Sequence, residues 1–246
     1  MKLRIAHLYP DLLNLYGDIG NITTLTKRCQ WRGIDVETDQ ITGGEKIHFT
    51  DYDLIFLGGG SDREQLLVRD KLISMKQEIT SYVNDGGVLL AVCGGYQLLG
   101  HYYDTSEGRI AGLGLVDLYT VQGSPRLISN VVLESDRYDM KITGFENHGG
   151  RTHTGDLPPF GKVLFGYGNN GEDGREGVVW KNVIGTYLHG PLLPKNPMVA
   201  DDLLIRAMDR KYGIRELEEL DDSWEREANQ YIVDRFTAGH TARSAV

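Results

Sequence analysis

The sequence has 246 residues, of which 40% are hydrophobic and 25% are charged, as in ordinary soluble globular proteins. This length fits one large α/β domain, and we expect residues 1–246 to form a single domain. The formal net charge is −9 without a basic stripe, which argues against nucleic acid or an anionic membrane surface as the main partner. Two cysteines are too few for a disulfide framework. Because no apolar leader and no run of about 18 apolar residues occurs, we predict a cytoplasmic protein without membrane insertion.

The first half of the sequence alternates apolar strands with helices. Apolar runs predict strands at 3–9, 34–41 and 53–60, and helical periodicity predicts helices at 22–32 and 63–84. Asn21 is the predicted N-cap of the first helix. Such alternation predicts an α/β fold with a doubly wound, largely parallel sheet and right-handed crossovers. Ligands of such sheets bind beyond the carboxyl ends of the strands.

The stretch from Val88 to Gly100 joins an apolar strand to a helix through Cys93 and two glycines. A nucleophile at such a turn stands clear of the sheet, and the start of the next helix stabilises its anion. Three glycines, 58–60, also follow the preceding strand, so we expect them at the same sheet edge. Neither a dinucleotide fingerprint nor a phosphate loop occurs, and no cofactor is expected in this chain. Cys93 is the candidate nucleophile.

The second half changes to short alternating strands and glycine-rich turns between Gly112 and Gly190. We expect these strands to be antiparallel or mixed additions to the sheet. C-terminal helices are predicted over 198–236, split into 198–212 and 216–236, with a frayed tail at 237–246. His148 and His153 lie close together in this half, but acidic or cysteine ligands at zinc spacing are missing, so no metal is expected.

Several motifs together resemble a known family. The segment Cys93-Gly-Gly-Tyr-Gln97 resembles the Cys-x-Gly-x-Gln elbow of class I glutamine amidotransferases, and Tyr187-Leu-His189-Gly resembles the segment with their catalytic histidine. More narrowly, other segments resemble the cobyric-acid-synthase-like branch and, within it, the glutaminase subunits of lipid II isoglutaminyl synthases; these are 9–11, 15–21, 126–130 and 149–152. The resemblance covers nearly the whole chain and implies the flavodoxin-like fold of class I amidotransferases.

The resemblance implies hydrolysis of L-glutamine to glutamate and ammonia. Cys93 would attack the side-chain carbonyl carbon, and His189 would transfer the protons. Backbone amides would hold the oxyanion of the tetrahedral intermediate. The candidates for these amides are Gly94 together with Gly59 or Gly60.

Substrate-binding residues follow from the same resemblance. Arg126 is the candidate for the α-carboxylate of glutamine, and a guanidinium suits bidentate pairing with it. Gln97 would position the side-chain amide of the substrate, or would only tie the elbow helix to a neighbouring loop.

The chain departs from the family pattern after its histidine. Many class I amidotransferases continue with Pro-Glu, whereas here His189 is followed by Gly-Pro-Leu. We therefore expect the acidic third member of the triad to be donated by a partner subunit or to be dispensable, and the isolated chain to have low glutaminase activity. Asp11, Asp18 and Asn21 are candidate turn and cap residues, an interpretation we prefer for Asn21, and the family pattern indicates a partner-facing role for their loop.

The resemblance also implies a partner. A Mur-ligase-like synthetase subunit would hold ATP and Mg²⁺ and use the ammonia to convert D-glutamate of the lipid II stem peptide to D-isoglutamine. Three alternatives stay open: a glutaminase component of a cobyric-acid-synthase-like amidotransferase, a stand-alone cysteine hydrolase of the same fold, and a non-catalytic regulatory module. The presence of both Cys93 and His189 argues against the last, and Gln97 and Arg126 favour free glutamine over a peptide.

Overall fold

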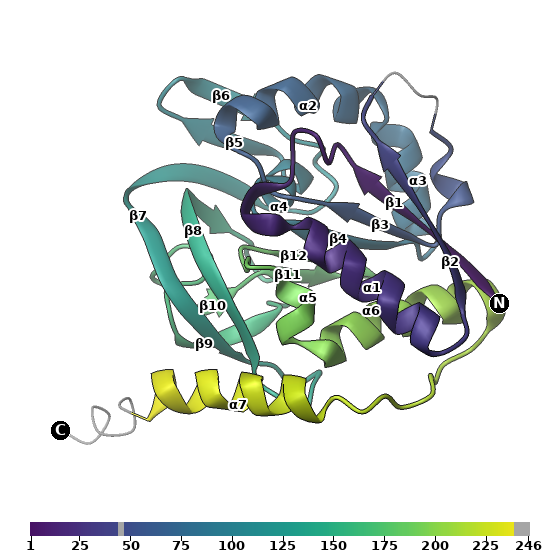
Figure 1. Cartoon of the computed structure of the whole chain (residues 1–246). Coiled ribbons are helices and arrows are strands. Elements are labelled where there is room, and N and C mark those ends of the chain that lie inside the picture. The colour runs from purple at the N-terminus through teal and green to yellow at the C-terminus, as the bar shows by residue number, and fades with distance from the viewer. Residues whose placement is uncertain (44–46, 239–246) are drawn as a thin grey trace.

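The computed structural model describes residues 1–43 and 47–238, which form two sheets with helices on both faces of the first (Figure 1). The first sheet has the strand order β11-β12-β4-β3-β1-β2. Its strands are β1 (Lys2–Leu8), β2 (Asp35–Ile41), β3 (Leu54–Leu57), β4 (Val88–Val92), β11 (Val178–Trp180) and β12 (Val183–Thr186). Every neighbouring pair is parallel except β11 with β12. The predicted doubly wound, flavodoxin-like order is confirmed.

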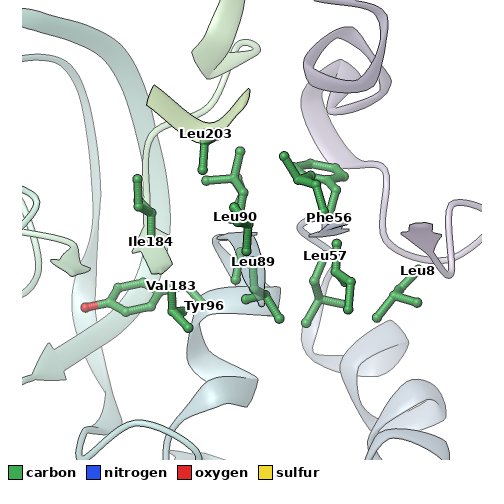
Figure 2. Packing of buried hydrophobic residues seen from close by; sticks show 14 of the residues in the cluster. Leu8, Phe56, Leu57, Leu89, Leu90, Tyr96, Val183, Ile184 and Leu203 are labelled. Carbon is green, nitrogen blue, oxygen red and sulfur yellow. The ribbon is translucent and has the colours of Figure 1, made fainter. Parts of the chain in front are cut away.

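The central strands are apolar throughout because both of their faces are covered. All residues of β3 and β4 are buried, which is the pattern of strands in a parallel sheet between two helical layers. Figure 2 shows Leu90 of β4 between Leu203 and Phe56 of β3, and Tyr96 near Val183 on the sheet. Each fully buried side chain of this size contributes about 2 kcal/mol through burial, which makes this layer the core of the fold.

The helices confirm the predicted alternation but differ at their ends. They are α1 (Ile19–Trp31), α2 (Asp62–Ser74), α3 (Lys76–Asn84), α4 (Gly94–Leu99), α5 (Leu192–Lys195), α6 (Pro197–Tyr212) and α7 (Ser223–Thr237). Short 3₁₀ turns occur at η1 (Leu15–Gly17) and η2 (Phe49–Asp51). No helix in the described ranges is long and apolar enough to cross a membrane.

Three helix predictions need correction. The first helix begins earlier than predicted, with Asp18 at its N-cap, and Asn21 lies buried inside it, where its Oδ1 accepts the Leu193 amide at 2.9 Å. The helix predicted at 63–84 is two helices, because the chain leaves helical geometry at Met75 (φ −101°, ψ 7°). The last helix is shorter than 216–236, since residues 216–222 are not helical. Most of the predicted tail, residues 239–246, lies outside the described residues.

A second sheet replaces the additions predicted for the second half. Its order is β10-β9-β7-β5-β6, and β8 also pairs with β7. Its strands are β5 (Tyr102–Thr105), β6 (Gly108–Ala111), β7 (Tyr119–Glu134), β8 (Ile142–His153), β9 (Gly161–Phe165) and β10 (Arg175–Glu176). Among the described strands of this half, β11 and β12 alone join the first sheet. The prediction of short strands was wrong for β7 and β8, which form a long antiparallel pair that curves past the first sheet (Figure 1).

The two sheets together define where a site can form. The strands β1, β3, β4 and β12 are parallel neighbours, so their carboxyl ends share one edge of the first sheet. An isolated bridge between Phe145 of β8 and His189 connects this edge to the second sheet. The loops after these four strands therefore meet the second sheet at one place.

Candidate active site

Cys93 lies between β4 and α4 with φ 51° and ψ −109°. A non-glycine residue with such dihedral angles stores about 1–3 kcal/mol of backbone strain, which is common for nucleophiles on elbows. The surrounding backbone holds the turn: the Cys93 amide donates to the Thr186 carbonyl at 2.8 Å, and the Gln97 amide donates to the Cys93 carbonyl at 3.0 Å. The chain thus has the predicted strand-turn-helix elbow.

His189 follows β12, the parallel neighbour of β4, and is fully buried. Its backbone pairs with Phe145 of the second sheet, since its amide donates to the Phe145 carbonyl at 2.7 Å. The imidazole and the thiol converge over Gly59. A Cβ added to that glycine would lie 2.9 Å from His189 Cε1 and 3.0 Å from Cys93 Cβ. The structure therefore brings the two predicted catalytic residues together and leaves no space for a side chain between them.

Asp18 is the carboxylate of this site. It lies in the loop after β1, is fully buried, and its Oδ1 is 3.6 Å from His189 Nδ1. This is an ion-pair distance that is longer than a hydrogen bond. Its other oxygen, Oδ2, accepts the Gly59 amide at 2.7 Å. The expectation that this chain places no acidic group beside His189 is corrected. Asp18 is the N-cap residue of α1, but its side chain makes no capping hydrogen bond.

The charges around His189 determine its protonation. Burial lowers the pKa of this imidazole, but the charges of Cys93 and Asp18 outweigh burial and raise the pKa to about 10. His7 on β1 behaves differently, because burial lowers its pKa to about 4 despite the charge of Asp18. At neutral pH His189 is therefore an imidazolium and His7 is neutral. A cationic imidazole next to a thiol can donate a proton to a leaving amine.

The glycines predicted for the oxyanion hole have different roles. The Gly59 amide is already used by Asp18. Gly60 lines the same cleft as Cys93. Gly94 lies against it, since a Cβ added to Gly94 would be 3.0 Å from the Gly60 carbonyl oxygen. Of the two alternatives, Gly60 is thus the better candidate to act with Gly94, and Gly59 instead holds the carboxylate.

The cleft in front of Cys93 has a volume of about 340 Å³, a size suited to a small molecule. Arg126, from β7 of the second sheet, lines it as predicted. The backbone and side chain of Asn147 fix its guanidinium, with Nε 3.0 Å from Asn147 Oδ1 and Nη2 2.9 Å from the Asn147 carbonyl. An oriented guanidinium in the nucleophile's cleft is suited to a carboxylate of the substrate.

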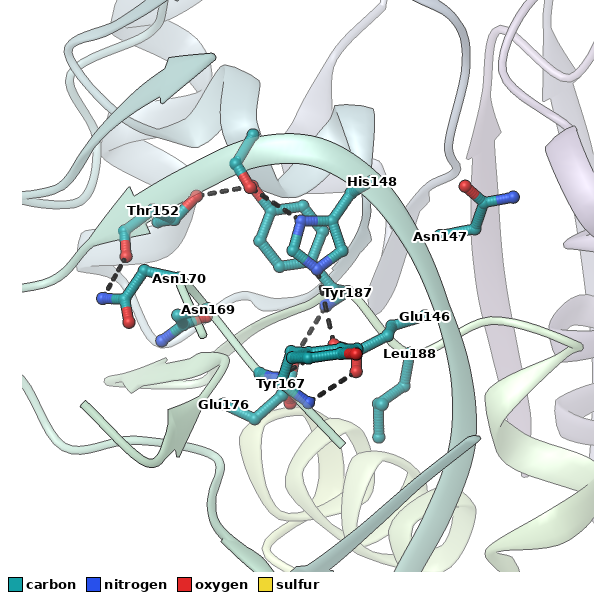
Figure 3. Close-up of polar contacts among 12 residues, drawn as sticks. Glu146, Asn147, His148, Thr152, Tyr167, Asn169, Asn170, Glu176, Tyr187 and Leu188 are labelled. Carbon is teal, nitrogen blue, oxygen red and sulfur yellow. Dashed lines mark hydrogen bonds and ion pairs between the residues drawn. The ribbon is translucent and has the colours of Figure 1, made fainter. Parts of the chain in front are cut away.

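Gln97 also lines the cleft, but both ends of its side chain are engaged. Its Oε1 accepts Gln65 Nε2 at 2.9 Å, and its Nε2 donates to the Tyr187 hydroxyl at 3.1 Å. The structure supports the second of the two predicted roles, because these bonds tie α4 to α2 and to the segment that carries the histidine. The Tyr187 hydroxyl bonds further to Thr152, as the chain of contacts in Figure 3 shows.

Sequence reasoning missed a buried polar layer behind His189 (Figure 3). Glu176 accepts the Tyr187 amide at 2.7 Å and the Thr186 hydroxyl at 3.0 Å, and burial raises its pKa to about 8. The Tyr187 ring stacks on His148 with centroids 3.6 Å apart. These contacts fix the strand end from which His189 projects. Their signal in the sequence is weak, because the residues come from three separate strands.

The pair of histidines considered for a metal has other contacts. His148 packs on Tyr187, and its Nδ1 is 2.8 Å from the Gly150 carbonyl, while His153 stacks on Tyr119. Within residues 1–43 and 47–238 no group of three or more potential metal ligands occurs. Both histidines therefore have structural surroundings on β8.

The chain is similar to proteins of known class. A family model described as the CobB/CobQ-like glutamine amidotransferase domain matches residues 4–197. The lipid II isoglutaminyl synthase (glutamine-hydrolyzing) subunit GatD of Staphylococcus aureus (strain N315) is 47% identical over 235 residues, which cover 95% of this chain and 96% of that protein. The subunit of the same name from Streptococcus pneumoniae (strain ATCC BAA-255 / R6) is 43% identical, over 86% of this chain and 83% of its own. A probable cobyric acid synthase of Methanococcus maripaludis (strain C5 / ATCC BAA-1333) is 32% identical, over 72% of this chain and 37% of its own length.

Solved structures support the same fold. PurLQS from Thermotoga maritima matches with a TM-score of 0.57 and 20% identity, covering 85% of this chain and 99% of the matched chain. A glutamine amidotransferase structure matches with a TM-score of 0.54 and 16% identity, covering 82% of this chain and 98% of the other. The family match extends over most of the sequence, and the resemblance inferred from the motifs is confirmed. The chain belongs to the family of CobB/CobQ-like glutamine amidotransferases.

Proposed function

We propose that this chain is the glutamine-hydrolysing subunit of a lipid II isoglutaminyl synthase. The observation that carries the proposal is the 47% identity to the Staphylococcus aureus subunit over nearly the full length of both chains. The convergence of Cys93 and His189 at one sheet edge supports catalysis rather than a purely regulatory role. Similarity to the cobyric acid synthases is lower, at 32% identity, so the cobyric-acid-synthase-like function is the second choice.

The first half of the reaction releases ammonia. The proton of the Cys93 thiol passes to His189, and the sulfur attacks the side-chain carbonyl carbon of L-glutamine while the carbonyl π electrons move to oxygen. The amides of Gly60 and Gly94 hold this oxyanion, each contributing roughly 3 kcal/mol by analogy with single donors removed from comparable sites. His189 then gives its proton to the amide nitrogen, the carbon–nitrogen bond breaks, and ammonia leaves behind a glutamyl thioester.

The second half restores the enzyme. His189, now neutral, takes a proton from a water molecule, whose oxygen attacks the thioester carbon. The carbon–sulfur bond breaks, glutamate leaves, and Cys93 and His189 regain their starting state. The carboxylate of Asp18 stabilises the imidazolium in both halves, because it lies 3.6 Å from Nδ1. Since this distance exceeds a hydrogen bond, an acid from a partner subunit is a second source of the same stabilisation.

Arg126 binds the α-carboxylate of the substrate in this proposal. Two of its nitrogens contact Asn147, while Nη1 makes no hydrogen bond within the described residues. A carboxylate that approaches Nη1 therefore meets a guanidinium that is already oriented. Because the guanidinium is already oriented, binding of the carboxylate costs less conformational entropy.

The ammonia needs an acceptor on another subunit. We infer a Mur-ligase-like partner in the cytoplasm that holds ATP and Mg²⁺, activates the α-carboxylate of D-glutamate in the lipid II stem peptide, and forms D-isoglutamine. Support comes from the names of the two GatD relatives, which are subunits of an enzyme that makes this product. The sequence itself carries no phosphate loop.

An isotope experiment tests the proposal. The chain and a candidate Mur-ligase-like subunit are incubated with lipid II, ATP, Mg²⁺ and glutamine labelled with ¹⁵N in the side-chain amide. We expect mass spectrometry to find ¹⁵N in the stem peptide, and a Cys93→Ala complex to transfer none from glutamine but still to use added ammonium. Glutamate release without label in the peptide would contradict the proposed acceptor, and absence of glutamate would contradict the glutaminase activity.

A further inference from the structure

A free amino acid carries two opposite charges, and the proposed function so far assigns a partner to only one of them. The cleft in front of Cys93 is lined by two acidic and two basic side chains, which are Asp62, Glu107, Arg63 and Arg126. A lining with equal numbers of both signs suits a zwitterion better than a simple anion or cation. The α-ammonium group of glutamine therefore requires an anionic partner within this cleft.

Asp62 is the better placed of the two acids. It is the first residue of α2, directly after the glycine turn that ends at Gly60. Burial raises the pKa of its carboxyl, while Arg126 and a hydrogen bond with Tyr103 act in the opposite direction. The residue as a whole is exposed, and its carboxyl lies within interaction range of both the arginine and the phenol. Glu107 also lines the cleft, but from the turn between β5 and β6 of the second sheet rather than from the segment that follows the glycine turn.

Tyr103 lies within electrostatic range of both Asp62 and Cys93. This residue is 3% exposed, and the pKa of its hydroxyl is raised by burial first and then by the charges of Asp62 and Cys93, while Arg126 lowers it. One phenol therefore has the nucleophile, the arginine and the aspartate all within electrostatic range. The groups needed for the two ends of a small amino acid lie around a single side chain.

Neither helix capping nor ion pairing accounts for Asp62. A carboxylate in the first turn of a helix often stabilises the helix dipole. Here, however, Ser61 and Glu64 already form a capping box at this end of α2. In the part of the chain that the structure describes, no ion pair joins Asp62 to Arg126. The guanidinium of Arg126 is hydrogen-bonded to Asn147 instead. The carboxylate is available to a ligand.

We propose that Asp62 binds the α-ammonium group of glutamine, so that Asp62 and Arg126 together select a free α-amino acid. This inference rests on the proposed glutaminase function and adds a determinant of its substrate specificity. Amides that keep the chain length and the carboxylate but lack the amino group would lose this contact. Peptide-bound glutamine, whose α-nitrogen is uncharged, would lose it as well.

Binding calorimetry tests the assignment without turnover. In a Cys93→Ala background we compare L-glutamine with glutaramate, the analogue that lacks only the amino group. We expect Asp62→Asn to weaken glutamine binding roughly tenfold to a hundredfold, the loss of one charge-assisted contact, and to leave glutaramate binding unchanged within about twofold. The ratio of the two affinities is the readout, because damage to the fold would weaken both ligands together.

Asp70→Asn is the matched control, since Asp70 lies on the same helix, is exposed and pairs with Arg69 at 2.9 Å. It should change neither affinity. If Asp62→Asn weakens both ligands equally, or neither, the assignment of Asp62 is wrong while glutamine binding itself stands. If the Cys93→Ala protein binds no glutamine, alone or with its synthetase partner, the proposed function fails before the role of Asp62 is reached.

Discussion

Helix α1 has a buried charged group near each end, and the two groups differ in how completely they are hydrogen-bonded. Towards its C-terminus, Arg28 is 2% exposed and makes bidentate contacts with Asp201 (2.6 and 2.6 Å) and with Asp222 (2.6 and 2.8 Å). At its start, Asp18 is fully buried but lies 3.6 Å from His189. Burial of charge costs free energy unless hydrogen bonds compensate it. The first cluster is therefore structural, whereas the second retains the incomplete pairing of a site that moves protons.

The contacts of Arg28 also affect the position of Asp18, at the other end of the same helix. Arg28 connects α1 to α6 through Asp201 and to the segment before α7 through Asp222. Arg32 adds a second contact to Asp201 at 2.7 Å. Because these bonds fix the orientation of the helix, they also limit where Asp18 can lie at its other end. We therefore predict that substitution of Arg28 mainly lowers stability, whereas substitution of Asp18 mainly lowers activity.

The largest effect should follow from removing the nucleophile. We expect Cys93→Ala to reduce glutamine hydrolysis at least about a thousandfold, because no thioester can form, with little change in the melting temperature. Glutamate release and thermal unfolding measure the two properties. Cys29→Ala is the matched control: burial raises the pKa of Cys29 to about 12, so this thiol is inert and activity should persist. Activity that survives loss of Cys93 would reject the mechanism.

Substitution of Arg28, near the C-terminus of α1, should lower stability and leave activity largely intact. Arg28→Ala leaves two aspartates without their partner, and we expect the free energy of unfolding to fall by about 3–5 kcal/mol. Hydrolysis per folded molecule at low temperature should change far less. Urea unfolding together with activity at 10–15 °C, roughly the range of maximum stability, separates these effects. As a control, Arg109→Ala removes an exposed pair with Asp104 and should cost little. Equal costs for the two arginines would contradict the structural role.

Asp18→Asn tests the functional end of the helix. Asparagine keeps an oxygen for the Gly59 amide but loses the charge that stabilises the His189 imidazolium, so we expect activity to fall about a hundredfold or more. The pKa of His189 should fall as well, which NMR titration can follow. The measurement is made on the isolated chain and on its complex. Activity restored only in the complex would assign the catalytic acid to the partner, and undiminished activity in both would remove Asp18 from the mechanism.

The parts of the molecule that local sequence determines were predictable. β3 and β4 are continuous apolar runs, and the two glycines after Cys93 mark the elbow, so the parallel sheet and the nucleophile follow from neighbouring residues. Asp18 was missed because its role depends on a tertiary contact with His189, although its place after β1 puts it at the same sheet edge.

The second sheet shows the same limit on a larger scale. Alternating side chains predicted strands in this half of the chain, but alternation does not say which strand becomes the neighbour. The length of β7 and β8 and their departure from the first sheet come from pairing with each other. Gln97 is a similar case at the level of one residue, because its two amide contacts come from α2 and from Tyr187, which are distant in sequence.

The last expected effect concerns how stability depends on pH. Glu176 has a folded-state pKa raised to about 8 from a usual value of 4.5, so the folded protein binds this proton more tightly than the unfolded chain. Its contribution is full below 4.5 and is lost as pH rises towards 8. Asp201 in the Arg28 cluster has a lowered pKa, so its contribution is lost on acidification instead. The two acids therefore give opposite slopes.

Glu176→Gln isolates the first slope. Glutamine keeps an oxygen for the Tyr187 amide at the position that now accepts it at 2.7 Å, but it does not titrate. We expect the variant to gain stability relative to the natural protein as pH rises from 5 to 8, a shift that urea unfolding at several pH values measures. His189, with a folded pKa of about 10, loses its contribution between about 6.5 and 10 in both proteins, so the difference between them removes it. Parallel stability profiles would mean that Glu176 is already ionised in the folded state and that the polar layer behind His189 holds a charge.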